Sequence, residues 1–275
     1  MTKTILITGA SSGIGKAAAS KFSAEGWNVI ATMREPEKGT ELTAKNVLLE
    51  KLDVEDEDSI QHAITKGLER FGSIDAVINN AGYGQSGVFE AISADKVRKQ
   101  FDVNVFGVMN VTRAILPHFR KQKSGLILNI SSGAGRFTLP LISLYAASKF
   151  ALEGFSEALS FELFPLNIQV KIIEPGGTAT NFNKVSADEF AHDPSLTDYD
   201  KFTTAAGQLF DSLRAQTLVS SEAVAEVIYN AATDGTDTLR YVIGNEGFMK
   251  RLEARAILPD QVYVDSIKTE ITPYL

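Results

Sequence analysis

The sequence contains no cysteine, and this absence excludes disulfide bonds, thiolate metal sites and a cysteine nucleophile. Its three histidines, His62, His118 and His192, are far apart along the chain and lack the spacing of a metal site. No apolar run approaches the roughly 18 residues that a membrane span requires. The short run Ile5–Ile7 leads straight into glycines, so we expect no signal peptide. These absences predict a metal-free protein of the cytoplasm with no membrane segment.

Positive charge is also scarce. The chain carries 27 lysines and arginines against 34 aspartates and glutamates, which gives a net charge of −7 and a pI near 5.1. Nucleic acid is therefore not an expected partner. With 44% hydrophobic residues and no low-complexity tract, the 275 residues can bury a large core. We expect a single domain over residues 1–275 that acts on a small molecule.

A glycine-rich turn follows the first predicted strand. Residues 4–8 are apolar enough for a buried strand, and a helix is predicted from about Ile14 onwards. Glycine at Gly9, Gly13 and Gly15 lets backbone N–H groups approach a pyrophosphate at the positive end of that helix. The spacing is G-x-x-x-G-x-G and not the general dinucleotide pattern G-x-G-x-x-G, so a simple tight turn is the alternative.

The end of the next predicted strand, residues 27–32, indicates which dinucleotide would bind. An acidic side chain there would accept hydrogen bonds from the adenosine ribose and would repel a 2′-phosphate. This chain has Met33 and Arg34 instead, and an arginine forms charge-assisted hydrogen bonds with such a phosphate. We therefore predict NADP(H) in preference to NAD(H), with a solvated loop arginine as the alternative.

Two further predicted strands end in residues suited to a nucleotide. After residues 47–52, the Asp53 carboxylate, with Val54 beside it, can accept from an adenine amino group or cap the helix over about residues 57–71. After the fourth strand, the small residues in Asn79–Gly82 let a ribose pack on the backbone, and an asparagine amide can join adjacent strand ends. Strands alternating with helices predict an α/β fold, a doubly wound parallel sheet of Rossmann type with helices on both faces.

A tyrosine and a lysine four residues apart are the strongest chemical signal. On a helix, Tyr145 and Lys149 project from one face, and a cation beside a phenol favours the phenolate. Lowering the phenol pKa by roughly two to three units takes about 3–4 kcal/mol. Ser132 follows the apolar run 126–130 and can donate to a carbonyl oxygen that Tyr145 also reaches. For the pair alone, an ordinary amphipathic surface is the alternative.

Together these motifs resemble those of the short-chain dehydrogenase/reductase family. The matching residues, over roughly residues 3–182, are Thr8-Gly9-x-x-x-Gly13-Ile14-Gly15, Asn79-Asn80-Ala81-Gly82, Asn104, Ser132, Tyr145-x-x-x-Lys149 and Pro175-Gly176. The resemblance implies an NADP(H)-dependent oxidoreductase that interconverts a ketone or aldehyde and an alcohol by hydride transfer. The cofactor would supply the hydride, and the protein would supply orientation and a proton.

The resemblance also implies a role for each matching residue. Tyr145 would be the general acid or base, Ser132 would polarise the substrate oxygen, and Lys149 would lower the Tyr145 pKa and hold the nicotinamide ribose. Asn104 would hold a water in a proton relay. The implied cofactor-binding residues are Gly9, Ser11, Ser12, Gly13, Ile14, Gly15, Arg34, Asp53, Val54, Asn80, Ala81, Gly82, Tyr145, Lys149, Pro175, Gly176, Thr178 and Thr180.

Two features depart from the family pattern. Ser12 stands where NADP-preferring members often carry a basic residue, so the NADP prediction rests on Arg34 and on the missing acid. A C-terminal extension of about residues 245–275 follows the last predicted strand, somewhat like that of the steroid- and retinol-active branches. We expect a helix over about residues 251–258 of it.

The remaining predictions concern substrate and assembly. Residues 183–212 are polar and weakly periodic, which predicts a mobile lid, with a static pair of surface helices as the alternative. Apolar residues between Ser132 and Tyr145 favour an apolar substrate, and the lid could add four phenylalanines, Phe182, Phe190, Phe202 and Phe210. In this family, helices such as those expected near residues 101–119 and 146–164 pair across a two-fold axis, which implies a homodimer or homotetramer.

Two other functions remain open from the sequence. A non-catalytic NADP(H)-binding regulator would bind cofactor without oxidising NADPH in the presence of ketones, and it could dispense with Ser132, Tyr145 and Lys149. An NAD-using epimerase or dehydratase would hold its cofactor tightly and show no net redox change. The chain lacks the sizeable C-terminal substrate domain of that larger group and has different glycine spacing.

Overall fold

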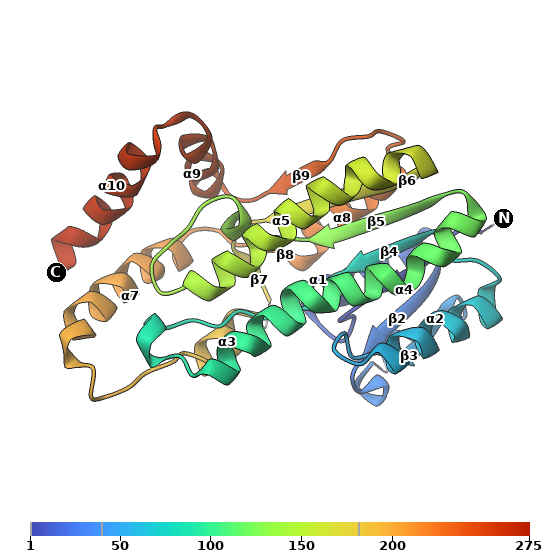
Figure 1. Ribbon diagram of the computed structural model, residues 1–275, viewed down its shortest axis with the longest axis horizontal. Helices are drawn as coiled ribbons and strands as arrows, with labels where there is room; N and C mark the ends of the chain where they lie inside the picture. Colours follow the sequence, from blue (N-terminus) through green and yellow to red (C-terminus); the bar gives the residue numbers. More distant parts are fainter. Residues whose placement is uncertain (1, 40, 181) are drawn as a thin grey trace.

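The computed structural model describes residues 2–39, 41–180 and 182–275, and its central feature is a seven-stranded parallel sheet. The strand order is β3-β2-β1-β4-β5-β6-β9, and helices cover both faces (Figure 1). The predicted doubly wound, Rossmann-type architecture is therefore confirmed. The strands are β1 (Thr4–Ile7), β2 (Asn28–Met33), β3 (Val47–Lys51), β4 (Ala76–Asn79), β5 (Gly125–Ile130), β6 (Ile168–Pro175) and β9 (Arg240–Ile243), with a separate pair, β7 (Thr178–Ala179) and β8 (Val219–Ser220).

The helices alternate with these strands and then continue beyond the sheet. They are α1 (Gly13–Ala24), α2 (Glu57–Phe71), α3 (Ala94–Phe101), α4 (Gly107–Gln122), α5 (Ser143–Leu163), α6 (Phe182–Asp188), α7 (Asp200–Arg214), α8 (Ser221–Thr233), α9 (Glu246–Ile257) and α10 (Asp260–Ile271). Within the described ranges, no helix combines the length and the apolar character needed to cross a membrane.

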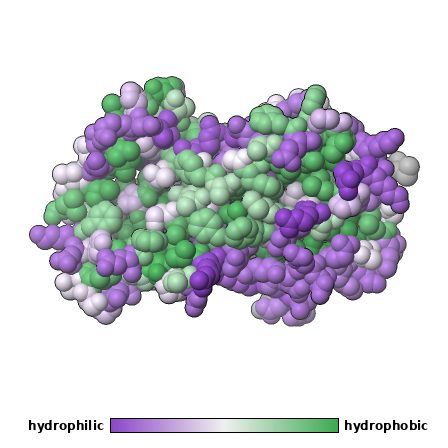
Figure 2. Space-filling model, viewed as in Figure 1, coloured by the Kyte–Doolittle hydropathy of each residue, from purple (hydrophilic) through white to green (hydrophobic). Residues whose placement is uncertain are grey.

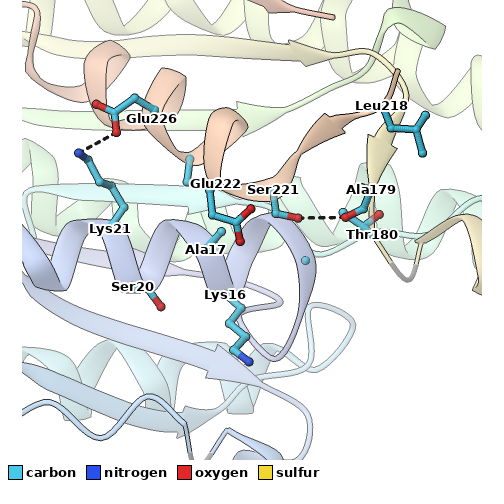
Figure 3. Close-up of a pocket in the computed structure, with 12 residues that line it drawn as sticks. Lys16, Ala17, Ser20, Lys21, Ala179, Thr180, Leu218, Ser221, Glu222 and Glu226 are labelled. Atoms are coloured by element: carbon cyan, nitrogen blue, oxygen red, sulfur yellow. Dashed lines mark hydrogen bonds and ion pairs between the residues drawn. The ribbon is translucent and has the colours of Figure 1, made fainter. Parts of the chain in front are cut away.

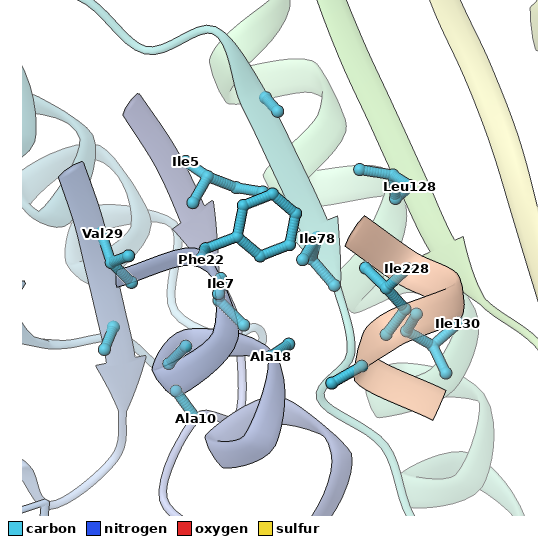
Figure 4. Close-up of a cluster of buried hydrophobic side chains, with 14 of the residues drawn as sticks. Ile5, Ile7, Ala10, Ala18, Phe22, Val29, Ile78, Leu128, Ile130 and Ile228 are labelled. Atoms are coloured by element: carbon cyan, nitrogen blue, oxygen red, sulfur yellow. The ribbon is translucent and has the colours of Figure 1, made fainter. Parts of the chain in front are cut away.

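Two apolar layers, one on each face of the sheet, hold the helices in place. On one face, Phe22 of α1 packs with Ile5 of β1 and Ile78 of β4, and Ile228 of α8 completes the layer (Figure 4). On the other face, Phe119 of α4 is buried among residues of α2 and α5. Strands covered on both faces are apolar without alternation, as in the fully buried β1. Each buried phenylalanine side chain contributes roughly 1.5–3 kcal/mol to stability.

The start of α2 corrects one sequence-based alternative. Asp56, not Asp53, caps this helix, because its Oδ1 accepts hydrogen bonds from the N–H groups of Asp58 (3.1 Å) and Ser59 (3.2 Å). Asp53 lies before the cap, and its Oδ1 accepts from the N–H of Glu55 (3.2 Å). Its carboxylate therefore stabilises the turn between β3 and α2 and not the helix end.

The helical stretch after Ser93 consists of three segments. Ser93 Oγ accepts from the N–H of Lys96 (3.4 Å) and caps α3. A π-helical turn over Asp102–Phe106 then joins α3 to α4. Such turns occur frequently at functional sites, and this one carries Asn104.

The segment expected to be a lid, residues 183–212, packs on two neighbours. Ser86, in the loop after β4, donates from its Oγ to the carbonyl oxygen of Ser186 (2.9 Å). Leu209 of α7 is buried against Ile271 of α10. In Figure 1 the α9–α10 pair turns back so that the C-terminus lies near α7. Movement of this segment on ligand binding stays a prediction.

Candidate active site

The carboxyl ends of β1 and β4 are joined by one side chain. Asn80 donates from Nδ2 to the carbonyl oxygens of Thr8 (2.9 Å) and Gly9 (3.1 Å), and its backbone N–H donates to Thr8 Oγ1 (2.9 Å). The predicted link between strand ends is therefore confirmed. Ala81 lies directly against the glycine turn, since a Cβ on Gly9 would stand 3.0 Å from Ala81 Cα.

The turn between β1 and α1 has the shape of an anion site. Gly9 and Gly13 have φ angles of +67° and +54°, a region that favours glycine. A Cβ on Gly15 would lie 2.4 Å from the Gly9 carbonyl oxygen. Ser12 is the N-cap of α1, but among the described residues its side chain accepts no hydrogen bond from the helix N–H groups. Ser11 and Ser12 are both exposed. The first N–H groups of α1 are thus available, which fits a dinucleotide pyrophosphate. 

A cavity of about 900 Å³ opens beside this turn, between α1 and α8 (Figure 3). Ile14 does not line it, because its side chain packs against the apolar core. Figure 3 shows Lys16 and Lys21 leaving α1 on different sides. Lys21 pairs with Glu226 of α8 (2.7 Å), and Lys16 pairs with Glu41. Carboxylates therefore already engage both lysines of the cavity.

The residues expected to hold the adenosine lie at the ends of β2 and β3. Arg34 follows β2 directly, is exposed, and forms no ion pair with the residues that the structure describes. Asp53 is partly exposed at the end of β3. Val54 is buried, and its carbonyl oxygen accepts from Asn110 Nδ2 (3.3 Å). The Arg34 guanidinium is thus free to meet a ligand at this edge.

The segment expected to hold the nicotinamide leads from β6 to α6. Pro175 is the last residue of β6, and Thr178 Oγ1 donates to the carbonyl oxygen of Gly176 (3.0 Å). Thr180 Oγ1 accepts from the N–H of Phe182 (3.2 Å), where α6 begins. These residues connect the carboxyl end of the sheet to the predicted lid.

Ser132 and Tyr145 meet at the end of β5. Burial raises the pKa of Tyr145 to about 12, and a side-chain hydrogen bond with Ser132 opposes this rise. Ser132 Oγ also accepts from the N–H of Ala134 (3.1 Å). The net direction is opposite to the lowered pKa expected beside Lys149. The ammonium lies 5.8 Å from the centre of the Tyr145 ring, and loss of water around the phenol is the larger effect.

Lys149 is buried, with 7% of the residue exposed. Its Nζ donates to the carbonyl oxygen of Ile130 (2.9 Å), at the end of β5. Burial lowers the pKa of Lys149 to about 8, while Glu153, one helical turn further along α5, raises it. The amine can therefore exchange a proton close to neutral pH, as acid–base groups of enzyme sites do.

Asn104 is buried, and its side-chain amide is hydrogen-bonded. Its Oδ1 accepts from the N–H of Tyr83 (3.0 Å), and its Nδ2 donates to the Tyr83 carbonyl (2.8 Å) and to Ser148 Oγ (3.2 Å). Gly82 lies against it, since a Cβ there would stand 3.1 Å from Asn104 Oδ1. Asn104 therefore connects the loop after β4 to α5 on the turn that carries Tyr145.

An aromatic ring packs beside Tyr145. The ring of Phe182 lies 5.4 Å from the Tyr145 ring, centre to centre. Arg136, the charged residue between Ser132 and Tyr145, turns inward and donates from Nη1 to the buried Glu174 (2.8 Å). Phe202, which was also expected to face the cleft, packs in the cluster between α7 and α10.

Two further residues lie in this site and were missed from the sequence. Gln100 donates from Nε2 to the carbonyl of Tyr83 (2.9 Å), and its four-residue spacing from Asn104 was a usable signal. Phe248 of α9 contacts Gly133, the residue after Ser132. No local pattern in the sequence distinguishes Phe248.

The Lys149 pKa predicts how stability depends on pH. Below pH 8 the amine is charged in both states, and the folded state carries the cost of burying that charge. Between pH 8 and about 10.5 the folded protein loses the proton while the unfolded chain keeps it, so this contribution to the free energy of unfolding rises with pH. Lys149→Met should therefore be more stable than wild type near pH 7 by on the order of 2 kcal/mol, and the advantage should shrink by pH 10.

Urea unfolding of both proteins at several pH values measures this difference. Lys121→Met removes an exposed lysine of α4 and serves as the control for the loss of one surface charge. An advantage of Lys149→Met that is constant from pH 7 to pH 10 would contradict the prediction.

Comparisons with known proteins agree with this geometry. A family model described as short chain dehydrogenase matches residues 3–190. The oxidoreductase YusZ of Bacillus subtilis is 36% identical over an alignment of 286 positions that covers 98% of each chain. Retinol dehydrogenase 8 of Bos taurus is 33% identical over 247 residues, which cover 83% of this chain and 78% of the relative.

Solved structures give the same answer. A short-chain dehydrogenase from Streptomyces avermitilis superposes with a TM-score of 0.79 at 32% identity, covering 100% of this chain and 97% of the other. Other structures of similar fold were determined with NAD or with NADP. From the matched motifs, the sheet topology and these relatives, this oxidoreductase chain belongs to the short-chain dehydrogenase/reductase family.

Proposed function

We propose that the chain is an NADP(H)-dependent oxidoreductase that interconverts an apolar ketone or aldehyde and the corresponding alcohol. The observation that carries this proposal is the grouping of Ser132, Tyr145 and the buried Lys149 at the end of β5. The Ser132 side chain opposes the rise in the Tyr145 pKa, and the Lys149 Nζ lies 5.8 Å from the centre of the Tyr145 ring. A hydroxyl pair and a buried amine supply the proton and the positive charge that carbonyl reduction needs. The cofactor, when bound, supplies the hydride.

The residues have distinct tasks in this proposal. In reduction, Tyr145 donates its hydroxyl proton to the substrate oxygen, while Ser132 donates a hydrogen bond to the same oxygen. A pKa of about 12 keeps the phenol protonated at neutral pH, which suits the acid. Lys149 stabilises the phenolate that remains and can return a proton to it. Asn104 holds the Tyr83 backbone and retains an acceptor lone pair for a water of the proton relay.

An apolar substrate is proposed from the surroundings of Tyr145. Phe182 faces its ring, and the pairing of Arg136 with Glu174 keeps that charge away from the substrate. A substrate carboxylate or phosphate would find no arginine there, whereas an apolar carbonyl would meet aromatic surface. Retinol dehydrogenase 8, a relative named for an apolar alcohol, supports the same class.

Replacing Tyr145 tests the proposed acid. Tyr145→Phe should lower kcat for ketone reduction at least 100-fold, because the ring remains and the proton is lost. NADPH binding should change less than about twofold. Steady-state NADPH oxidation and a fluorescence titration measure the two effects, with Tyr274→Phe near the chain end as the matched control. Full turnover by Tyr145→Phe would reject the proposed mechanism. If the wild-type protein binds cofactor but oxidises no NADPH across a broad panel of ketones, the alternative of a non-catalytic NADP(H)-binding regulator would be favoured.

Replacing Arg34 tests the choice of cofactor. NADPH should bind at least tenfold tighter than NADH, and Arg34→Ala should lose that margin, about 1.4 kcal/mol, because one charge contact to the 2′-phosphate disappears. Titration of both cofactors measures it. Arg70→Ala, at the far end of α2, controls for the lost charge. Equal binding of NADPH and NADH by wild type would reject the NADP assignment and leave the Tyr145 proposal standing.

We expect a homodimer or homotetramer. Four phenylalanines of the π turn, of α5 and of the position directly after α5 are exposed. They are Phe106, Phe150, Phe161 and Phe164, with 53%, 42%, 72% and 76% exposed. In Figure 2 hydrophobic residues gather along the middle of the face in view, over α4 and α5.

Light scattering should give a molar mass two or four times the 29.8 kDa of one chain. The double variant Phe161→Ser, Phe164→Ser should have a lower molar mass, because it removes apolar surface from the expected contact. The control Phe89→Ser, at another exposed site, should keep the wild-type molar mass. A one-chain mass at every concentration would exclude assembly.

A cytoplasmic location stays a prediction from the sequence. It rests on the finding that no helix among the described residues is long and apolar enough to cross a membrane. Fractionation of cells that express the tagged chain would check it, and recovery with the membrane fraction would reject it.

A further inference from the structure

One aromatic ring of the C-terminal extension lies against glycines from three separate strand ends. A Cβ added to Gly133 would stand 2.1 Å from the Phe248 ring. The corresponding distances to the ring are 2.8 Å for Gly176 and 2.0 Å for Gly244. Each distance is far below van der Waals contact, so any side chain at these positions would displace the ring. Phe248 thus fills a space that exists because all three residues are glycine.

The three glycines belong to segments that carry the proposed chemistry or support it. Gly133 follows Ser132 at the end of β5, and Gly176 follows Pro175 at the end of β6. Gly244 follows β9, and the N–H of Gly176 donates to the carbonyl of Ile243 in that strand (2.7 Å). The Phe248 ring is therefore shared by the turn of the substrate-polarising hydroxyl and the segment proposed to hold the nicotinamide.

Several contacts hold Phe248 at this point. Asn245 caps α9, accepting at Oδ1 from the Phe248 N–H (2.9 Å) and donating from Nδ2 to the Thr217 carbonyl (3.0 Å). The Phe137 ring packs against the Phe248 ring, with 5.8 Å between the ring centres. Arg251 of α9 forms a two-bond ion pair with Glu270 of α10 (3.1 and 2.8 Å). The ring is therefore fixed to the body and to the α9–α10 pair.

We propose that Phe248 is a positioning residue, which sets the spacing between the Ser132 turn and the Pro175–Gly176 segment. Hydride transfer requires that the substrate oxygen and the nicotinamide be held at a defined separation, and displacements on the order of 1 Å reduce rates strongly. Phe248 acts through the backbone of Gly133 and Gly176. The C-terminal extension is then part of the active site. Its catalytic consequence rests on the function proposed above, while its structural consequence does not.

Replacing the ring should lower kcat by more than any loss of folded protein can explain. Phe248→Ala should reduce kcat about tenfold at a temperature where thermal unfolding shows the protein folded, and Phe248→Leu should recover most of the loss. Met249→Ala, the next residue of α9 and 43% exposed, is the matched control and should keep kcat within twofold. Equal kcat for Phe248→Ala and Met249→Ala would overturn the catalytic part of the proposal.

A double-mutant cycle tests whether the ring is the connection. Gly244 is not one of the proposed catalytic or cofactor-binding residues. Gly244→Ala should lower kcat about tenfold, because the added methyl group would push the Phe248 ring aside. In the Phe248→Ala background, Gly244→Ala should lower kcat less than twofold, because no ring remains to be displaced. Additive losses would overturn the proposal, since they would show that Gly244 acts independently of Phe248.

Hydrogen exchange provides a readout that needs no turnover. In Phe248→Ala, without cofactor, backbone amides in residues 131–137 and 176–180 should exchange at least tenfold faster than in Met249→Ala, while those of β1 should not change. Unchanged exchange in both segments would overturn the positioning role. If wild type reduces no ketone, the proposed function fails, and this measurement still decides whether Phe248 holds the two segments.

Discussion

Side-chain hydrogen bonds across the carboxyl ends of the central strands are the constraint on which the site depends. Asn80 joins β4 to the Thr8 and Gly9 carbonyls, and Asn79 Nδ2 donates to Asn129 of β5 (2.8 Å). Asn129 in turn donates to Ser156 of α5 (2.8 Å), so the chain of bonds reaches the helix of Tyr145 and Lys149. Buried polar groups that are satisfied in this way rigidify a structure, because breaking any one bond leaves an unpaired group. The strand ends therefore present their loops from fixed points.

Buried charge forms a second layer beneath the site. Glu153 and Glu174 are nearly inaccessible, and Arg240 bonds both, at 3.0 and 3.2 Å. Burial raises the pKa of Glu174, Glu153 adds to that rise, and Arg136 and Arg240 oppose it. The arrangement draws Arg136 away from the substrate side and places the Glu153 carboxylate one turn from Lys149. Glu153, one of the acids that hold β6, β9 and α5 together, therefore keeps the pKa of the Lys149 amine from falling further.

The C-terminal extension belongs to this arrangement. Through α10 it covers α7, and through Phe248 of α9 it reaches the ends of β5 and β6. The glycine turn, by contrast, is built locally from β1, α1 and the Asn80 amide. The turn proposed to hold cofactor phosphates and the proposed reacting end of the site are thus supported by different parts of the chain, one near the N-terminus and one near the C-terminus. A relative that lacked the extension would need another residue to occupy the space beside Gly133 and Gly176.

The sequence by itself determined the features that depend on neighbours in the chain. Alternating apolar runs and helical periods predicted the doubly wound sheet, and the four-residue spacing placed Tyr145 and Lys149 on one helix face. Only the tertiary structure decided features set by distant groups. Burial by surrounding elements reversed the direction of the Tyr145 pKa, and folding brought Phe248 to Ser132, because solvent exclusion and long-range contact exist only once the chain is packed.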